Sequence, residues 1–342
     1  MTETAADETT EVGSALLRYL QGEMPRASRM SISGLHRVGT GASRENWPFD
    51  LSWSDDDGQH AERLVLRRDP TGEVVATART EEFGLLKALE RTPVPAPIVR
   101  WLDDSGTHLI RPSMIVHRYD GAAHRAVLGR KDPLSLGVEA QVAVAMQMCD
   151  ILVQVHRVDV AASEIDSVLP DPGPAPAAHE LDKWQHILGE QQLEPQLAMG
   201  LASRWMHDHL PPPPKVERVI HGDFRPGNVL IHDKRVSVLL DWELSHRGDP
   251  LDDLGWYFAP LYRHEHFVPG RFGPAEFLAR YEDRSGMRVD RDALHFWQVM
   301  ATFRLAVMAL TGVRAFCAGQ AERPAAPAQV MVARVADAVL DP

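Results

Sequence analysis

Side chains able to do chemistry are concentrated in one stretch of the sequence, around Asp223. Two apolar runs at 216–220 and 229–231 enclose a polar segment that contains Asp223 and Asn228. The next apolar run, at 236–240, ends directly on Asp241. Because strand ends hold side chains more rigidly than free loops do, we expect these two acidic residues and one amide to be delivered to one place.

Phosphoryl transfer from ATP is the chemistry that this set suits. It needs a carboxylate to orient the attacking hydroxyl, oxygen ligands to hold Mg²⁺ on the phosphates, and a cation to offset developing charge. We predict Asp223 as the base and Arg225 as the cation. Mg²⁺ takes hard oxygen donors and shares them with phosphate, so Asn228 and Asp241 suffice as its ligands. His221 is expected to hold the loop by hydrogen bonding. The alternative is an ordinary turn, where Asp bonds backbone amides and glycine supplies positive φ.

The same stretch resembles the catalytic loop and metal-binding motif of the aminoglycoside phosphotransferase family. The resemblance rests on residues 221–231, followed by the Asp-Trp-Glu of residues 241–243. It implies an α+β, protein-kinase-like fold of two lobes and an ATP- and Mg²⁺-dependent kinase for a hydroxyl group of a small molecule. It also assigns Asp223 as the catalytic aspartate, and Asn228 and Asp241 as the magnesium ligands.

Two rival functions are protein kinase activity and nucleotide binding without catalysis. Residues 249–254 resemble the next signature of the family, where Asp253 would brace the catalytic loop. This motif follows Asp241 so closely that no room remains for the activation segment of a protein kinase, and the loop lacks the arginine that senses its phosphorylation. The second rival is a pseudokinase that acts only as a nucleotide-binding module. Loss of Asp223, Asn228 or Asp241 would indicate it, and all three are present.

A glycine-containing segment between two predicted strands is a candidate phosphate cover. Backbone amides at Gly39, Gly41 and Ser43 could lie over the ATP phosphates, although a plain hairpin turn explains the segment equally well. It lacks the third glycine of a dinucleotide fingerprint, and no Gly-Lys-Ser/Thr follows. Rossmann and P-loop nucleotide sites are therefore excluded.

Arg67 occupies the strand position where kinases carry the lysine that holds the α- and β-phosphates. A guanidinium can pair with phosphate and with a carboxylate, and Glu82 on the following helix is its expected partner. Arg68 and Glu81 remain alternatives for the two roles. Arg67 could instead be an exposed arginine at the strand end, and Glu82 or Glu81 an ordinary solvated helix residue.

One subgroup is similar over more of the chain: the kinase-like domain fused to certain acyl-CoA dehydrogenases. The similar segments are residues 64–72 (LVLRRDPTG), 82–83, 93–97 and 241–245. Arginine on that strand is usual there. The resemblance implies a hydroxyacyl-CoA or a related metabolite as one candidate acceptor, and it argues against an aminoglycoside antibiotic.

Charge bears on the acceptor and on partners. Asp and Glu total 48 against 36 Lys and Arg, a formal net charge of −12. Such a surface repels nucleic acid and anionic membrane, so we expect neither as a partner. It suits a cationic acceptor, whereas an anionic CoA ester needs a local basic patch. Arg118, Arg125, Arg130 and Lys131 could provide one, or they form a solvated basic loop.

The elements that must position these residues fall into two groups. We predict a polar leader and short helix over 1–29, an N-terminal nucleotide-binding lobe over 30–117, and a C-terminal catalytic and substrate-binding lobe over 118–342. Strands are expected at 30–38, 47–53, 61–68, 98–102, 108–119, 216–220, 229–231 and 236–240, and helices at 14–21, 75–89, 138–156, 252–260, 274–282 and 290–312. Substrate contacts should come from 121–215 and 244–342.

The remaining composition is that of an ordinary globular protein. The polar, acidic N-terminus has no secretory signal pattern, so a cytosolic location is expected. The only two cysteines, Cys149 and Cys317, lie far apart, which makes a disulfide framework improbable. The pairs His207/His209 and His264/His266 are expected to be surface histidines, and His156 a hydrogen-bonded core histidine.

Overall fold

The computed structural model describes residues 2–38, 45–69, 79–161, 164–320 and 327–340. Gly39, Gly41 and Ser43, the predicted phosphate cover, lie outside these ranges. The chain forms two compact units, residues 1–87 with 97–119 and residues 88–96 with 120–342. The predicted division placed the boundary at residue 117, whereas the first unit extends to Tyr119 and residues 88–96 group with the second.

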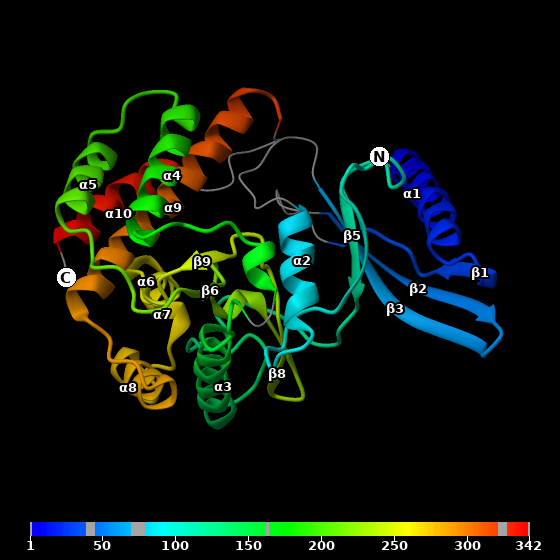
Figure 1. Cartoon of the computed structure of the whole chain (residues 1–342), viewed down its shortest axis with the longest axis horizontal. Helices are drawn as coiled ribbons and strands as arrows, with labels where there is room; N and C mark the ends of the chain where they lie inside the picture. The colour runs from blue at the N-terminus through cyan, green and yellow to red at the C-terminus, as the bar shows by residue number, and fades with distance from the viewer. Residues whose placement is uncertain (1, 39–44, 70–78, 162–163, 321–326, 341–342) are drawn as a thin grey trace. The chain divides into compact units, whose positions relative to one another are not determined.

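A five-stranded antiparallel sheet forms the first unit (Figure 1), in the order β1-β2-β3-β5-β4. The strands are β1 (Ser28–Ser33), β2 (Glu45–Asp55), β3 (Gly58–Arg68), β4 (Val99–Asp103) and β5 (Ser113–His117). Every second residue of β2 from Trp47 to Trp53 is buried, as expected for a strand with one face on a core. Phe49 pairs with Leu64 in β3, so both strands bury the same face.

Helix α1 (Thr2–Glu23) is longer than the predicted helix at 14–21. Val12, Leu16 and Leu20 are buried in the same core as the β2 side chains Trp47 and Phe49. The first 23 residues therefore belong to this unit and do not form a polar leader. The apolar stripe begins only at Val12, so the sequence before it carried no helical pattern to detect.

Helices dominate the second unit (Figure 1). They are α3 (Val138–His156), α4 (Pro176–Gln191), α5 (Leu197–Asp208), α6 (Leu251–Tyr257), α7 (Arg263–His266), α8 (Pro274–Ser285), α9 (Arg291–Cys317) and α10 (Ala328–Leu340). Helix α2 (Arg79–Leu89) belongs to the first unit up to Lys87. Short strands β6 (Arg218–Ile220), β7 (Val229–His232), β8 (Arg235–Leu239) and β9 (His246–Gly248) form two small ladders, β6-β9 and β7-β8.

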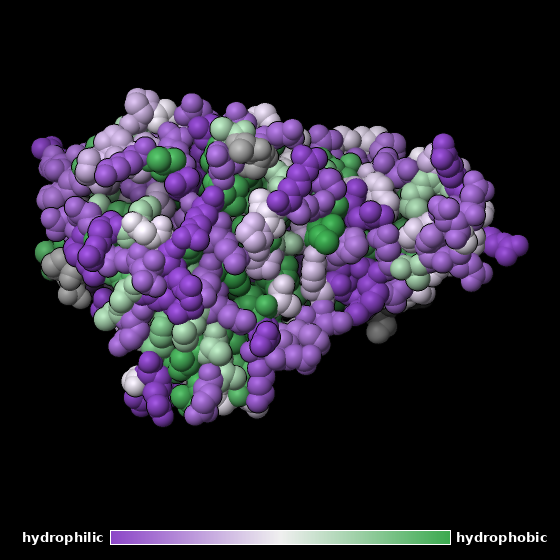
Figure 2. All heavy atoms as spheres, turned by 60° about the horizontal axis from the view of Figure 1, so that its bottom comes forward, coloured by the Kyte–Doolittle hydropathy of each residue, from purple (hydrophilic) through white to green (hydrophobic). Residues whose placement is uncertain are grey.

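Helix α9 is the centre of this unit. Phe296, Trp297 and Phe303 are completely buried on it, and α6 packs directly on its backbone. At Gly255 of α6, an added Cβ would lie 2.4 Å from the carbonyl carbon of Trp297, so only glycine allows this approach. By length and composition α3 and α9 could each cross a membrane, but half or more of their apolar stretches (50% and 56%) is buried, as in core helices. The face shown in Figure 2 is mostly hydrophilic, in agreement with the 25% of charged residues.

Candidate active site

The predicted catalytic loop runs from β6 to β7, and its geometry brings three polar residues together. Val229 of β7 pairs with Leu239 of β8, and the amide of Leu240 donates to the carbonyl of Asn228 at 2.7 Å. This pairing places Asp241, the residue after Leu240, beside the loop. The charge of Asp241 acts on the pKa of Asp223, so the two carboxylates are close.

Asp223 is held by one partner on each carboxylate oxygen. Arg225 Nε donates to Oδ1 at 2.9 Å, and Asn228 Nδ2 donates to Oδ2 at 2.7 Å. The side chain is 13% exposed, and burial raises its pKa above the ordinary value. The Asp241 charge raises it further, while Arg225, Asn228 and His221 oppose the shift. A more basic carboxylate is a better acceptor for a proton from an attacking hydroxyl.

Asn228 has its amide orientation fixed by two acceptors. Nδ2 donates to the backbone carbonyl of Asp223 at 2.8 Å as well as to its carboxylate. Both partners accept only, so the nitrogen must face them and Oδ1 must point the other way. An amide oxygen directed away from Asp223 suits a hard cation such as Mg²⁺.

Asp241 follows β8 in an unusual backbone conformation. Its φ is +69°, a region that non-glycine residues rarely adopt and that Asp tolerates better than most. Next to it, Trp242 is completely buried and its Nε1 donates to the Leu239 carbonyl at 2.8 Å. The buried indole thus anchors the turn that presents Asp241.

The loop is braced from behind by Asp253 of α6. Its two carboxylate oxygens accept hydrogen bonds from the backbone amides of His221 and Gly222, each at 2.8 Å. His156 Nε2 donates a further hydrogen bond to the same carboxylate at 3.0 Å. Burial alone would raise the pKa of Asp253, but the hydrogen bonds from His156 and from the backbone amide of His221 lower it below its ordinary value. The bracing contact expected for Asp253 is therefore present, and His156 is the buried, hydrogen-bonded histidine that was predicted.

His221 closes the loop from inside. Its Nδ1 accepts the Asp223 amide at 3.2 Å, so its Nε2 carries the proton and donates to the Leu240 carbonyl at 2.9 Å. The ring therefore ties the residue before Asp241 to Asp223, as the sequence suggested. Gly222 has a φ of +82°, and a Cβ there would lie 2.3 Å from the Leu244 carbonyl oxygen. No other residue fits at this position.

In the first unit, Arg67 Nη1 donates to Glu82 Oε1 at 3.2 Å. The arginine is 12% exposed and the glutamate is completely buried, so the pair is shielded from water. Arg68 instead donates to Glu45 at 2.7 and 2.9 Å and to Glu8 at 2.8 Å, and it is 2% exposed. Of the two arginines left open by the sequence, Arg67 is the one in contact with Glu82.

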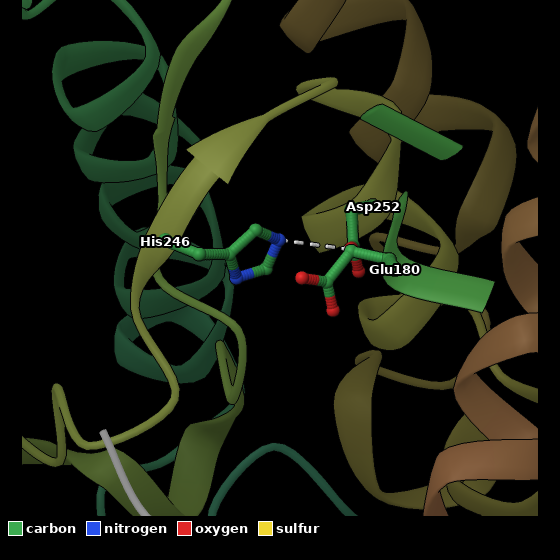
Figure 3. A group of neighbouring side chains, drawn as sticks. All are labelled: Glu180, His246 and Asp252. Atoms are coloured by element: carbon green, nitrogen blue, oxygen red, sulfur yellow. Dashed lines mark hydrogen bonds and ion pairs between the residues drawn. The ribbon is translucent and has the colours of Figure 1, made fainter. Parts of the chain in front are cut away.

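One group outside the loop has the composition of a metal site (Figure 3). Ligand atoms of Glu180, His246 and Asp252 lie within 4.8 Å of one another. His246 faces Asp252 Oδ2 with Nε2 at 3.2 Å and the Leu244 carbonyl with Nδ1 at 3.0 Å. Both partners accept, so the ring must donate from both nitrogens and is an imidazolium, which cannot ligate a metal.

Neighbouring cations complete this cluster. Arg304 of α9 donates to Asp252 through two nitrogens, and Lys183 donates to Glu180 at 3.0 Å. Burial alone would lower the pKa of His246, but Glu180 and Asp252 raise it above its ordinary value. Burial alone would raise the pKa of Glu180, but the charges of His246, Lys183 and Arg304 lower it to about 2. We interpret the group as a cluster of ion pairs, with two buried carboxylates and three cations, that joins α4, β9, α6 and α9.

The expectation of four surface histidines is wrong for one of them. His207, His209 and His264 are exposed, but His266 is 2% exposed. Its Nδ1 donates to the Tyr257 carbonyl at 2.7 Å, and burial lowers its pKa to about 4. The helix-breaking residues around it gave no apolar periodicity from which burial could be inferred.

A sheet with a buried Arg–Glu pair in one unit and a helical unit carrying this loop define a protein-kinase-like fold. Residues 38–297 match the model of the phosphotransferase enzyme family, which is most of the chain, and the chain belongs to that family. It is therefore a small-molecule phosphotransferase, as the resemblance implied.

Relatives agree with this assignment. Mouse acyl-CoA dehydrogenase family member 10 is 31% identical over 208 residues, which cover 58% of this chain and 19% of that protein. A protein from Ralstonia eutropha described as an aminoglycoside phosphotransferase has a TM-score of 0.70 at 19% identity, over 96% of this chain and 98% of its own. A thermostable mutant of aminoglycoside phosphotransferase APH(4)-Ia, in complex with AMP-PNP and hygromycin B, has a TM-score of 0.61 at 15% identity, over 95% and 98%. The chain spans about a fifth of the length of the first of these relatives.

Proposed function

We propose that this protein uses ATP and Mg²⁺ to phosphorylate a hydroxyl group of a small metabolite. The observation that carries the proposal is the Asp223 carboxylate, held by Arg225 and Asn228 and raised in pKa by burial and by Asp241. Such a group orients an incoming hydroxyl and accepts its proton as the phosphoryl group is transferred. The AMP-PNP complex of a structural relative supports a nucleotide as the donor.

The residues present fit a magnesium ion. Asn228 Oδ1 points away from Asp223, and Asp241 supplies a carboxylate beside it. When bound there, Mg²⁺ would neutralise phosphate charge during transfer. Arg225, whose Nε already binds Asp223, keeps the rest of its guanidinium fork for an oxygen of the transferred phosphate. Arg67, held by Glu82, would bind the other phosphates.

For the acceptor we propose a hydroxyacyl-CoA or a related anionic metabolite, not an aminoglycoside. The relative named acyl-CoA dehydrogenase family member 10 supports this choice, because the similar segment belongs to a protein named for acyl-CoA chemistry. The same test distinguishes this function from that of a pseudokinase.

The test is an ATP-consumption screen of the full chain against hydroxylated metabolites, hydroxyacyl-CoAs of several chain lengths, and kanamycin-class compounds. We expect turnover with an anionic acceptor, dependence on Mg²⁺, and loss of about 10²–10⁴-fold in kcat for Asp223→Asn with ATP affinity retained. Near-wild-type kcat in Asp223→Asn would show that the base is wrongly assigned. Nucleotide binding without turnover of any acceptor would favour the pseudokinase.

A further inference from the structure

A basic loop in the second unit lies directly against the catalytic loop. A Cβ added to Gly227 would be 3.4 Å from Arg125 Cβ and 3.5 Å from its Cα. Buried Gln141 of α3 fixes the loop by donating to the carbonyls of Val127 at 2.8 Å and Gly129 at 3.0 Å. Arg125 is therefore held next to the segment between Arg225 and Asn228 by a rigid backbone.

The partner of Arg125 is a buried carboxylate on α7. Arg125 Nη2 lies 3.3 Å from Glu265 Oε1, and the arginine side chain is 68% exposed while the glutamate is 8% exposed. The imidazole of His264 also lies near Glu265, with its Nε2 3.5 Å from Oε1, and the side chain is 76% exposed. Glu265 thus holds the guanidinium from its buried side, while most of the arginine side chain remains accessible to a ligand.

Tyr262 shows that this segment borders the catalytic residues. Its ring stacks on His266 at 5.4 Å between centroids, and His266 stacks on buried Tyr257 at 4.8 Å. Burial raises the pKa of Tyr262, Arg225 opposes the rise, and Asp223 adds to it, so the phenol lies within reach of both charges. Glu265 also raises the pKa of Tyr262 and Arg125 opposes the rise.

The local charge differs from that of the whole protein. Residues 121–131 and 260–264 contain basic side chains and no acidic ones, although the chain has a net charge of −12. The exposed basic members are Arg125, Arg130, Lys131 and Arg263. Arg118, a fourth member of the patch expected from the sequence, pairs instead with Asp50 in the first unit. Of these basic residues, Arg125 packs against Gly227 of the catalytic loop.

We propose that Arg125 binds an anionic group of the acceptor at the edge of the catalytic site, with Glu265 holding the arginine in place until the acceptor arrives. The ligand class is a hydroxylated small molecule that carries a phosphate or carboxylate. This inference rests on the proposed function, since it names the acceptor-binding residue of the same site.

Binding can be measured without knowing the acceptor. Calorimetry on the full chain, saturated with ADP and Mg²⁺ so that the nucleotide site is filled, would use coenzyme A as the anionic probe and pantetheine as its counterpart without phosphates. We expect coenzyme A to bind at least tenfold more tightly than pantetheine. Arg125→Ala should lower the affinity for coenzyme A about tenfold and leave the affinity for pantetheine unchanged. Arg125→Lys should restore part of the lost affinity.

Two further variants separate binding from a structural role. Arg288→Ala is the matched control, because Arg288 is also an exposed arginine paired with a more buried glutamate, Glu282, at 3.5 Å. It should leave coenzyme A affinity unchanged. Glu265→Gln removes the charge that neutralises Arg125, so it should tighten coenzyme A binding, whereas a contact that only stabilises the fold would weaken it or leave it unchanged.

Equal coenzyme A affinity in wild type and Arg125→Ala would overturn the proposal, as would weaker binding in Glu265→Gln or no binding to wild type. Failure of the proposed function is visible separately, as the absence of turnover with every acceptor in the ATP-consumption screen. Should Arg125→Ala unfold, Arg125→Lys and Glu265→Gln decide the matter, because both keep the size of the side chain.

Discussion

At the scale of single residues, the candidate site contains groups that we propose contact the reactants and groups that position them. Asp223 shares its oxygens between Arg225 and Asn228. Asp253 and His221 hold the backbone around it, and His156 in turn holds Asp253. The two magnesium candidates also differ, since Asp241 brings a charge and Asn228 a neutral oxygen. Their loss should therefore have unequal effects.

We expect Asp241→Ala to abolish the Mg²⁺-dependent part of ATP-analogue binding and Asn228→Ala to weaken it less. The reason is that a carboxylate is the only charged ligand in the predicted pair. Calorimetric titration with and without Mg²⁺ measures both. Equal nucleotide affinity in wild type and Asp241→Ala would remove Asp241 from the metal site.

The neighbouring arginines of β3 allow a paired comparison. Arg67→Ala and Glu82→Ala should each raise the KM for ATP, with a coupling of about 0.5–3 kcal/mol in a double-mutant cycle. Arg68→Ala should instead lower the melting temperature, because Arg68 is buried against Glu45 and bonded to Glu8. Additive losses in the cycle would show that Arg67 and Glu82 do not act together on the nucleotide.

At the scale of elements, prediction from the sequence succeeded where apolar periodicity was long and uninterrupted. Helix α3 has the predicted bounds, and β2, β3 and α9 extend the predicted segments by a few residues. Helices α4, α5 and α10 were not predicted individually, because their buried residues are sparse and mixed with polar ones.

The candidate site was predictable for a related reason. Asp223, Asn228 and Asp241 are close in sequence and joined by strands that pair locally, so spacing alone brings them together. Arg125 and Tyr262 reach the same place through contacts between distant segments, and no local pattern encodes such contacts. The burial of His266 depends in the same way on Tyr257 and Tyr262, which stack on it.

The unpredicted part of α1 gives a test at this scale. Leu16→Ala should lower the free energy of unfolding by about 2–5 kcal/mol, because Leu16 is completely buried against the β2 side chains. Arg18→Ala, on the exposed face of the same helix, is the control and should change it by less than about 0.5 kcal/mol. Chemical denaturation measures both free energies of unfolding. Equal stability of the two variants would show that α1 does not pack on the core of the first unit.

At the scale of the whole molecule, two buried histidines make the free energy of unfolding depend on pH, one of them on the acid side and the other on the alkaline side. His266 is neutral in the fold with a pKa of about 4, whereas the unfolded chain titrates near 6.5. As the pH falls from about 6.5 towards 4, the unfolded state takes up the proton first and stability decreases. His246 has a raised pKa in the fold, so its contribution is complete below about 6.5 and is lost as the pH rises through its folded pKa.

The alkaline limb is the more specific prediction. His246 lies beside Glu180 from α4 and Asp252 from α6, and its positive charge is attracted to both carboxylates. Arg304 from α9 and Lys183 from α4 pair with the same two carboxylates. Deprotonation removes the attraction between the imidazolium and the two buried carboxylates. We therefore expect the free energy of unfolding, measured by urea denaturation at intervals from pH 5 to 9, to decline above neutrality in wild type. His246→Gln should be less stable at pH 6 and should lose that decline, while His266→Gln should alter only the acid limb. An alkaline decline that persists unchanged in His246→Gln would show that the imidazolium does not stabilise the cluster.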